Sequence, residues 1–236
     1  MSESKTGRVY DLWSKVYDHT FGLLLTDGQK SAIEHMRLRP GDKVLDLGVG
    51  TGIQLPGYPR FATVVGLDLS AGMLARAEEK RRQLALDHCR IVRADAMLPP
   101  FAPRSFDHII ISHTISVVSD PRKMMMRAQE MLRPGGRIVL VNHFLSVNRF
   151  LAWGERKLNP LFVRLGWRSD LALEDVLAGT ALSVEYAFKM HQIGIWKIIV
   201  LAHQSEARPT PVDPAVAGQP VTSITVGGNR WAVGGG

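Results

Sequence analysis

The feature that most constrains this chain is an apolar strand that runs directly into a glycine-rich turn. Residues 44–52 read Val-Leu-Asp-Leu-Gly-Val-Gly-Thr-Gly, and a second apolar run at 63–67 leads to Asp68. Glycine has no Cβ, so the backbone of such a turn can pass close to a ligand and can adopt positive φ. An acidic residue about 20 positions beyond the first glycine can accept hydrogen bonds from ribose hydroxyls. The two features together predict a site for a cofactor that contains adenosine.

The spacing of the glycines separates this turn from other nucleotide-binding loops. Counted from Gly48, the dinucleotide fingerprint G-x-G-x-x-G requires glycine or alanine at the position of Ile53. Counted from Gly50, it requires glycine at the position of Leu55. No Gly-Lys-Ser/Thr follows, which excludes a P-loop. A glycine turn without a ligand is the remaining alternative, and the acidic residue Asp68 weighs against it.

Apolar runs and helical periodicity alternate along the chain, which predicts an α/β fold. The expected fold is a mostly parallel sheet with helices on both faces and an antiparallel pairing of the last two strands. Ser70 is expected to cap one of the helices, and Pro134-Gly135-Gly136 to form a tight turn. Helices are predicted at about 8–23, 27–37, 71–85 and 121–132, and strands at about 43–47, 63–67, 90–93, 106–112, 137–142, 182–189 and 195–202.

Composition excludes several classes of protein. A chain of 236 residues, 45% of them hydrophobic, can bury a core as one large domain without covalent staples. Cys89 is the single cysteine, so no intramolecular disulfide forms and a reducing cytosol suits the chain. We expect neither a signal peptide nor a membrane span, since the start is polar and no apolar run approaches ~18 residues. The eight histidines lack the paired spacing of zinc ligands, so no metal is expected.

The positive charge is concentrated in one segment. The formal net charge is +7, and residues 145–169 hold five basic residues against one acidic residue. Aromatic and aliphatic residues lie between these charges, a mixture that favours contact with an anionic membrane surface or a phosphate-bearing ligand. A solvated helical face over an ordinary core is the alternative. No motif for binding nucleic acid accompanies the charge, so nucleic acid is not an expected partner.

Four motifs in order over residues 44–141 resemble those of class I S-adenosylmethionine-dependent methyltransferases: 46–52, Asp68, Asp95-Ala96 and 132–136. The resemblance implies a Rossmann-like fold with a seven-stranded sheet and S-adenosyl-L-methionine as cofactor. Ligands of such sheets bind beyond the carboxyl ends of the strands. Asp68 would bind the ribose, the Asp95 carboxylate the adenine N6 amine and the Ala96 amide N1. The full set of cofactor-binding residues implied is Asp46, Gly48, Gly50, Thr51, Gly52, Asp68, Leu69, Met73, Asp95 and Ala96.

Further segments closely resemble the bacterial phosphatidylethanolamine N-methyltransferases. The likeness runs from about residue 8 to 203, and its most specific pieces are Val-Asn-His-Phe at 141–144 and Leu-Pro-Gly-Tyr-Pro at 55–59. It implies methylation of the amine of phosphatidylethanolamine, and of its mono- and dimethyl forms, toward phosphatidylcholine. Quinone methyltransferases share the glycine motif, so methylation of a quinone precursor or another small molecule is the alternative. A cofactor-binding module without catalysis is a more distant one. The other similar segments are 13–18, 49–54, 116–121 and 164–167.

The acceptor chemistry assigns roles to several side chains. The lipid amine is mostly protonated at neutral pH and must lose a proton before it attacks the methyl group. Tyr17, His143 and His113 are the candidate catalytic residues; solvent is an alternative acceptor, and His113 fits a purely local structural role equally well. Aromatic faces bind methylated ammonium groups, and basic side chains bind the phosphate. The candidate acceptor-binding residues are Tyr10, Trp13, Tyr17, His143, Arg164, Trp167 and Arg168.

The predicted organisation has three parts. Residues 1–40 form N-terminal helices that serve as a lid or as an interfacial membrane anchor. Residues 41–204 form the cofactor-binding domain, with 145–180 as an insertion facing the acceptor and membrane, and 205–236 form a disordered tail without catalytic residues. The expected location is the cytoplasm, peripherally on the inner face of the cell membrane. The sequence does not predict the oligomeric state.

Overall fold

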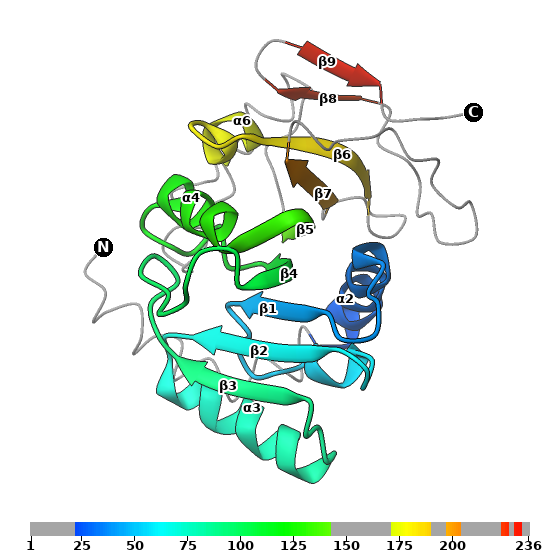
Figure 1. Cartoon of the computed structure of the whole chain (residues 1–236), viewed down its shortest axis with the longest axis vertical. Coiled ribbons are helices and arrows are strands. Elements are labelled where there is room, and N and C mark those ends of the chain that lie inside the picture. Colours follow the sequence, from blue (N-terminus) through cyan, green and yellow to red (C-terminus); the bar gives the residue numbers. More distant parts are fainter. Residues whose placement is uncertain (1–21, 143–170, 190–196, 204–222, 227–228, 233–236) are drawn as a thin grey trace.

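Seven strands form one sheet in the order β3-β2-β1-β4-β5-β7-β6 (Figure 1). The computed structural model describes residues 22–142, 171–189, 197–203, 223–226 and 229–232. Neighbours from β3 to β5 pair in parallel, and β7 is antiparallel to both β5 and β6. This confirms the predicted fold class. The strands are β1 (Lys43–Leu47), β2 (Thr63–Asp68), β3 (Cys89–Arg93), β4 (Phe106–Ser112), β5 (Leu132–Asn142), β6 (Leu182–Lys189) and β7 (Lys197–His203).

Two of the helices begin where the sequence supplies a capping side chain. The hydroxyl of Ser70 accepts a hydrogen bond from the backbone N–H of Met73 (3.2 Å), so Ser70 caps the helix that follows it, as predicted. The carboxylate of Asp120 caps the next helix in the same way through the N–H of Lys123 (2.9 Å), with Pro121 at the first helical position. The helices are α2 (Gly22–Met36), α3 (Ala71–Gln83), α4 (Pro121–Met131) and α6 (Leu173–Leu177), with a 3₁₀ turn, η1 (Leu55–Gly57).

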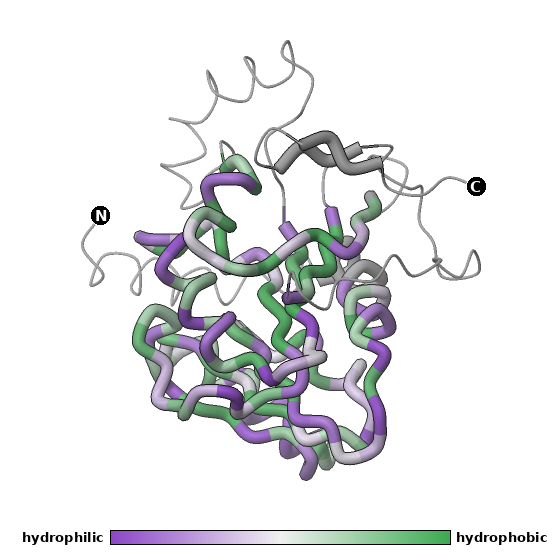
Figure 2. The backbone as a smooth tube through the Cα atoms, turned by 45° about the horizontal axis from the view of Figure 1, so that its top comes forward, coloured by the Kyte–Doolittle hydropathy of each residue, from purple (hydrophilic) through white to green (hydrophobic). Residues whose placement is uncertain are grey.

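The two faces of the sheet carry separate hydrophobic cores. Alternate residues of β1 separate accordingly: Leu45 and Leu47 belong to the core that α4 and α6 cover, and Val44 to the core that α2 and α3 cover. Because both faces are covered, the central strands read as nearly continuous apolar runs, which made them predictable. The tube in Figure 2 shows hydrophobic stretches, in green, running through the interior of the fold.

Three elements differ from the expectations. Helix α2 begins at Gly22, earlier than the predicted residue 27. The predicted turn Pro134-Gly135-Gly136 lies inside β5, where the register against β4 shifts between Phe106 and His108. The predicted tail contains two short antiparallel strands, β8 (Ser223–Val226) and β9 (Asn229–Ala232), which the lack of periodicity did not indicate. The predicted helix at 8–23 lies, apart from its last two residues, outside the described residues.

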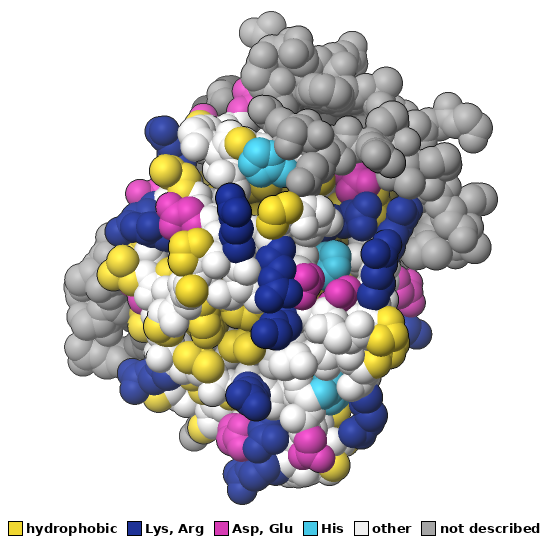
Figure 3. Space-filling view, in the orientation of Figure 1, with side chains coloured by type: hydrophobic (Ala, Val, Ile, Leu, Met, Phe, Trp, Pro, Cys, Tyr) yellow, Lys and Arg dark blue, Asp and Glu magenta, His cyan; other side chains and the backbone are white. Residues whose placement is uncertain are grey.

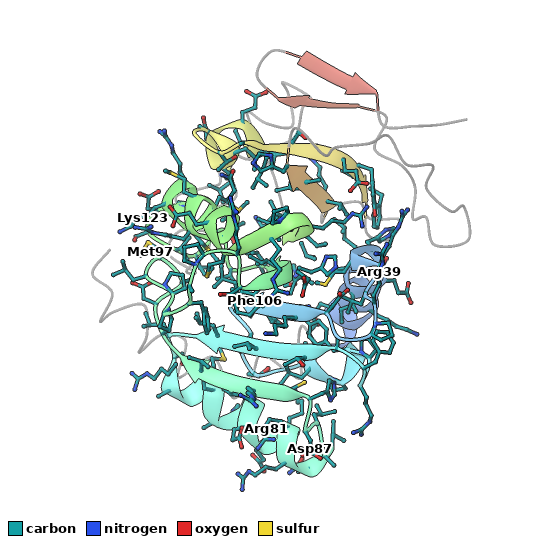
Figure 4. The ribbon with its side chains drawn as sticks, in the orientation of Figure 1. Arg39, Arg81, Asp87, Met97, Phe106 and Lys123 are labelled. Carbon is teal, nitrogen blue, oxygen red and sulfur yellow. The ribbon has the colours of Figure 1, made fainter. Side chains whose placement is uncertain are left out.

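Figure 4 distinguishes the side of the sheet where the parallel strands end from the side where they begin. Met97 and Lys123 follow the carboxyl ends of β3 and β4 along the chain, and both lie on the left of the view. Arg39 and Asp87 precede β1 and β3, and they lie toward the opposite side. In a parallel sheet the carboxyl edge is where ligands bind. The left edge of this view is therefore the one that carries the glycine turn.

Candidate cofactor and active site

The glycine turn is fixed to the neighbouring strand by backbone hydrogen bonds. Where β1 ends, the N–H groups of Gly48 and Val49 both donate to the carbonyl of Leu67 in β2 (2.7 and 3.0 Å). Gly48, Gly50 and Gly52 all have positive φ (+94°, +55° and +71°), a conformation that side chains other than glycine rarely adopt. The chain therefore turns sharply at the carboxyl edge of the sheet with its peptide groups held in place.

The three glycines have different surroundings. A Cβ added to Gly48 would collide with the side chain of Thr114, which follows β4. A Cβ on Gly52 would lie 2.7 Å from Leu55 Cδ1 and 3.0 Å from the Cα of Ala77 in α3. A Cβ on Gly50 would meet nothing within 4 Å. The turn is thus packed against protein at Gly48 and Gly52 and is open at Gly50.

Asp68 joins the end of β2 to this open part of the turn. One carboxylate oxygen accepts the N–H of Gly50 (3.0 Å) and the other accepts the N–H of Ser70 (2.9 Å). Burial raises the pKa of Asp68 above its usual range, and these backbone donors oppose the shift. Each carboxylate oxygen has a second lone pair, so Asp68 can also accept from ribose hydroxyls as predicted. Its position beside Gly50 suits that role.

The remaining adenosine-binding candidates follow β2 and β3. The Asp95 carboxylate accepts the backbone N–H of Met97 (2.8 Å), and Ala96 is buried. Leu69 is 46% exposed and offers an apolar surface for a purine ring at this edge, whereas Met73 is only 5% exposed and packs within the fold. Figure 3 shows hydrophobic side chains gathered on the left half of this face. Leu69 and Asp95 therefore follow adjacent strands, with one apolar and one polar group for the base.

Asp46 lies beneath the turn and is almost completely buried, at 1% exposure. Its carboxylate accepts a hydrogen bond from the Tyr58 hydroxyl (2.9 Å). Burial raises the pKa of Asp46 to about 7; the Tyr58 hydrogen bond opposes this shift and the negative charge of Asp68 adds to it. Thr51, in the turn itself, is buried as well. Asp46 and Thr51 therefore contribute to the site as buried residues that support the glycine turn.

His113 occupies a strained position directly after β4. Its φ is +58°, and its backbone N–H donates to the carbonyl of Val141 in β5 (2.7 Å). Burial lowers the pKa of His113 to about 4, so the imidazole is neutral at physiological pH. A group with such a low pKa is a weak base, because efficient general bases have pKa values near the operating pH. These features favour the local structural role over proton abstraction.

The other predicted acceptor residues lie outside the described residues: Tyr10, Trp13, Tyr17, His143, Arg164, Trp167 and Arg168. Their roles remain predictions. Asn142, which precedes His143, is buried and ends β5 at the carboxyl edge. Across the described ranges, no three His, Cys, Asp or Glu side chains are grouped to hold a metal ion. None of the helices in those ranges has the length and apolar character needed to cross a bilayer.

The sequence assigned no role to four polar side chains around the turn, although it placed Ser112 and Thr114 at the carboxyl end of a predicted strand. Thr114 contacts Gly48, and its hydroxyl donates to the carbonyl of Ser112 (3.0 Å). Gln54, Tyr58 and Ser112 form a hydrogen-bonded chain that ends on Asp46. For Gln54 and Tyr58, the available signal was the segment 49–59, which carried a resemblance but no assigned role.

The arrangement fits S-adenosylmethionine. An open glycine at the turn gives the ligand access to the backbone, and Asp68 supplies acceptors for a ribose diol. The apolar and polar groups that follow β2 and β3 suit an adenine base. The mismatch at Ile53 removes the dinucleotide alternative.

Comparison with known proteins agrees with this geometry. Residues 45–140 match a family model described as a methyltransferase domain. A phosphatidylethanolamine N-methyltransferase from Cereibacter sphaeroides is 34% identical over 84% of this chain and 98% of its own length. The chain belongs to the bacterial phosphatidylethanolamine N-methyltransferase family. Its cofactor is S-adenosylmethionine, and it is a class I methyltransferase.

Two other similarities are informative. A demethylmenaquinone methyltransferase from Oceanobacillus iheyensis is 28% identical over 58% of this chain and 63% of its own length. A solved structure of a geranyl diphosphate methyltransferase in complex with S-adenosylmethionine has a TM-score of 0.63 and 17% identity, covering 75% of this chain and 85% of that chain. The structural likeness supports the fold. The shorter sequence match shows that more than half of the chain is also similar to a demethylmenaquinone methyltransferase.

Proposed function

We propose that this protein transfers methyl groups from S-adenosylmethionine to the amine of phosphatidylethanolamine, and of its mono- and dimethyl forms, to produce phosphatidylcholine at a membrane surface. The observation that carries the proposal is the extent of the likeness to the Cereibacter sphaeroides relative, which covers 84% of this chain. The methyltransferase domain model covers only residues 45–140. The similarity therefore continues well beyond the matched methyltransferase domain, into segments that contain the proposed acceptor-binding residues.

The chemistry requires little from the protein beyond alignment and exclusion of water. The cofactor's sulfonium supplies an activated methyl group when bound. The chain's own residues must hold the lipid amine in line with that group and accept a proton from it. Among the candidates, Tyr17 and His143 are the proposed proton acceptors, because the low pKa of His113 makes it a weak base. Arg164 and Arg168 are the proposed phosphate donors, and Tyr10, Trp13 and Trp167 the proposed aromatic contacts.

A quinone precursor is the second candidate acceptor. The match to the demethylmenaquinone methyltransferase from Oceanobacillus iheyensis supports it, but that match covers 58% of this chain, against 84% for the phospholipid enzyme. The difference in coverage favours the lipid acceptor.

The acceptor is tested by supplying radiolabelled S-adenosylmethionine with phosphatidylethanolamine vesicles and, separately, with demethylmenaquinone. We expect label in mono-, di- and trimethylated lipid on chromatography and none in the quinone fraction. Label in the quinone alone would replace the proposal with the second candidate. Cofactor binding without transfer to either would leave a binding module.

Binding to the membrane surface is the second expectation. The net charge of +7 and the basic, aromatic segment at 145–169 favour anionic lipid. In cosedimentation, we expect the protein to pellet with vesicles that contain phosphatidylglycerol and to dissociate as salt rises from about 0.05 to 0.5 M, because the Debye length falls severalfold. Equal binding to vesicles of neutral phosphatidylcholine, or binding unaffected by salt, would contradict the electrostatic part of the proposal.

A further inference from the structure

A chain of three hydrogen bonds, two of them buried and one partly buried, links the carboxyl ends of β1 and β4 beneath the glycine turn. The Ser112 hydroxyl donates to Gln54 Oε1 (3.0 Å), Gln54 Nε2 donates to the Tyr58 hydroxyl (2.8 Å), and that hydroxyl donates to Asp46 Oδ2 (2.9 Å). Gln54 and Tyr58 are 5% and 3% exposed. All three donors point the same way along the chain of residues, so every hydrogen bond in it supports negative charge at its end, Asp46.

The turn after the glycines builds this arrangement. Residues 55–57 form the 3₁₀ turn η1, in which Pro56 fixes φ, and the Tyr58 N–H donates back to the carbonyl of Leu55 (3.3 Å). The turn places Gln54 and Tyr58 side by side against the end of β1. Leu55 is fully buried in the core that α2 and α3 cover, which fixes the turn on the sheet. The Leu-Pro-Gly-Tyr-Pro segment therefore positions the Tyr58 hydroxyl to donate a hydrogen bond to the Asp46 carboxylate.

Asp46 and Asp68 form an acidic pair under the cofactor turn. β1 and β2 are parallel neighbours, with Asp46 opposite Gly66, so the two carboxylates lie near the ends of adjacent strands. Their mutual repulsion contributes to the raised pKa of Asp46, after burial. The donors described above for the two groups are a phenol and backbone N–H groups, which are neutral. A bound cation would therefore be attracted by both carboxylates.

The substrate and product forms of the cofactor differ in net charge. S-adenosylmethionine carries a sulfonium and has a net charge of +1, whereas S-adenosylhomocysteine is a neutral thioether with no net charge. We propose that Gln54 and Tyr58 are positioning residues that keep Asp46 ionised, so that the site binds the cationic cofactor more tightly, relative to the neutral product, than the turn alone would. They act through Asp46 and need not touch the cofactor. This role of Gln54 and Tyr58 is the same whichever acceptor is methylated.

Tyr58→Phe tests the proposal by calorimetry with each cofactor form alone. At pH 7 we expect the affinity for S-adenosylmethionine to fall about tenfold, the effect of one hydrogen bond to a charged group. The affinity for S-adenosylhomocysteine should fall no more than about threefold, because the lost interaction acts chiefly on charge. Since no acceptor is present, failure of the lipid assay would not affect this result.

The pH dependence gives a second readout. A cationic ligand favours ionised Asp46, so affinity for S-adenosylmethionine should rise with pH as Asp46 ionises. Removing the Tyr58 hydroxyl should move this rise to higher pH, because the phenol lowers the pKa of Asp46. The other titratable groups facing Asp46 are Tyr58, Cys89 and Asp68. Burial raises the pKa of Tyr58 well above its usual range and that of Cys89 to about 11, so both stay neutral below pH 9. Asp68 is retained in the variant.

Tyr186→Phe is the matched control. Tyr186 is 4% exposed, and its hydroxyl donates to the carbonyl of His35 (3.3 Å), away from the glycine turn. The Tyr186→Phe variant should lose stability as Tyr58→Phe does. Its ratio of affinities for S-adenosylmethionine and S-adenosylhomocysteine should equal that of the parent protein. Equal weakening of both ligands in Tyr58→Phe, or an unmoved pH profile, would overturn the proposal. Should Tyr58→Phe not fold, Gln54→Met breaks the preceding bond, and an unchanged affinity ratio in that variant would overturn it equally.

Discussion

Replacing Asp68 with alanine is expected to weaken binding of S-adenosylhomocysteine about 100-fold. The carboxylate accepts the N–H groups of Gly50 and Ser70, so its removal releases the open part of the turn as well as the proposed ribose contact. Hydrogen bonds to a charged group are worth about 1.5–3 kcal/mol, and a loss near 2.7 kcal/mol corresponds to about 100-fold in affinity. Isothermal titration calorimetry measures the loss directly. Asp68→Asn keeps one acceptor oxygen and should give an intermediate value.

Asp42→Ala provides the control for Asp68→Ala. Asp42 also accepts a backbone N–H, from Arg39 (2.7 Å), and it lies within 3.4 Å of the His108 imidazole. Because Asp42 precedes β1, it is at the edge of the sheet opposite the glycine turn. The variant should lose stability and retain cofactor affinity. If folded Asp68→Ala protein bound the cofactor as tightly as the parent, the ribose assignment would be wrong.

The sequence predicted those parts of the fold that depend on local pattern. The strands β1, β2 and β4 are buried on both faces, so their apolar runs were sufficient to place them within a residue of their ends. Ser70 predicted the start of α3, because a serine hydroxyl at that position can accept a hydrogen bond from the backbone N–H of the third residue of the helix. The glycine pattern and Asp68 placed the cofactor turn, because both features follow from the needs of one ligand.

The parts that were missed depend on contacts between distant residues. The turn residues Pro134, Gly135 and Gly136 lie within β5, between Leu132 and Arg137, where the pairing with β4 is interrupted by a register shift and Gly135 has a φ of +77°. The turn preference of these residues therefore appears as an irregularity inside a strand, which depends on how β5 pairs on either side of it. The link between Tyr58 and Asp46 depends on how η1 folds back over β1, and no spacing in the sequence reveals it. The pKa of about 4 at His113 likewise results from burial in the assembled fold, which a residue at a predicted strand end does not disclose. Tertiary packing therefore decided which polar residues carry the site.

Substitution of Gly50 by alanine should separate cofactor binding from stability. The added methyl group would meet no protein atom within 4 Å, so the main cost to folding is the positive φ of +55°, about 1–2 kcal/mol. The same methyl group would project from the open part of the turn, where the bound cofactor is expected. Crowding by one added methyl group in a close-packed contact costs about 1–3 kcal/mol, which corresponds to roughly 5- to 150-fold in binding affinity. We therefore expect a small fall in the unfolding midpoint and a loss of affinity of roughly 30- to 100-fold by calorimetry.

Gly52→Ala is the informative comparison, because its methyl group would point into the protein. Its Cβ would lie 3.0 Å from the Cα of Ala77, and backbone in a packed helix cannot yield as a side chain can. Crowding of this kind costs about 1–3 kcal/mol in addition to the cost of positive φ. Gly52→Ala should therefore be the less stable protein and Gly50→Ala the weaker binder. If Gly50→Ala bound S-adenosylhomocysteine normally, the open side of the turn would not be the cofactor side, and the ligand would have to approach the sheet from a different direction.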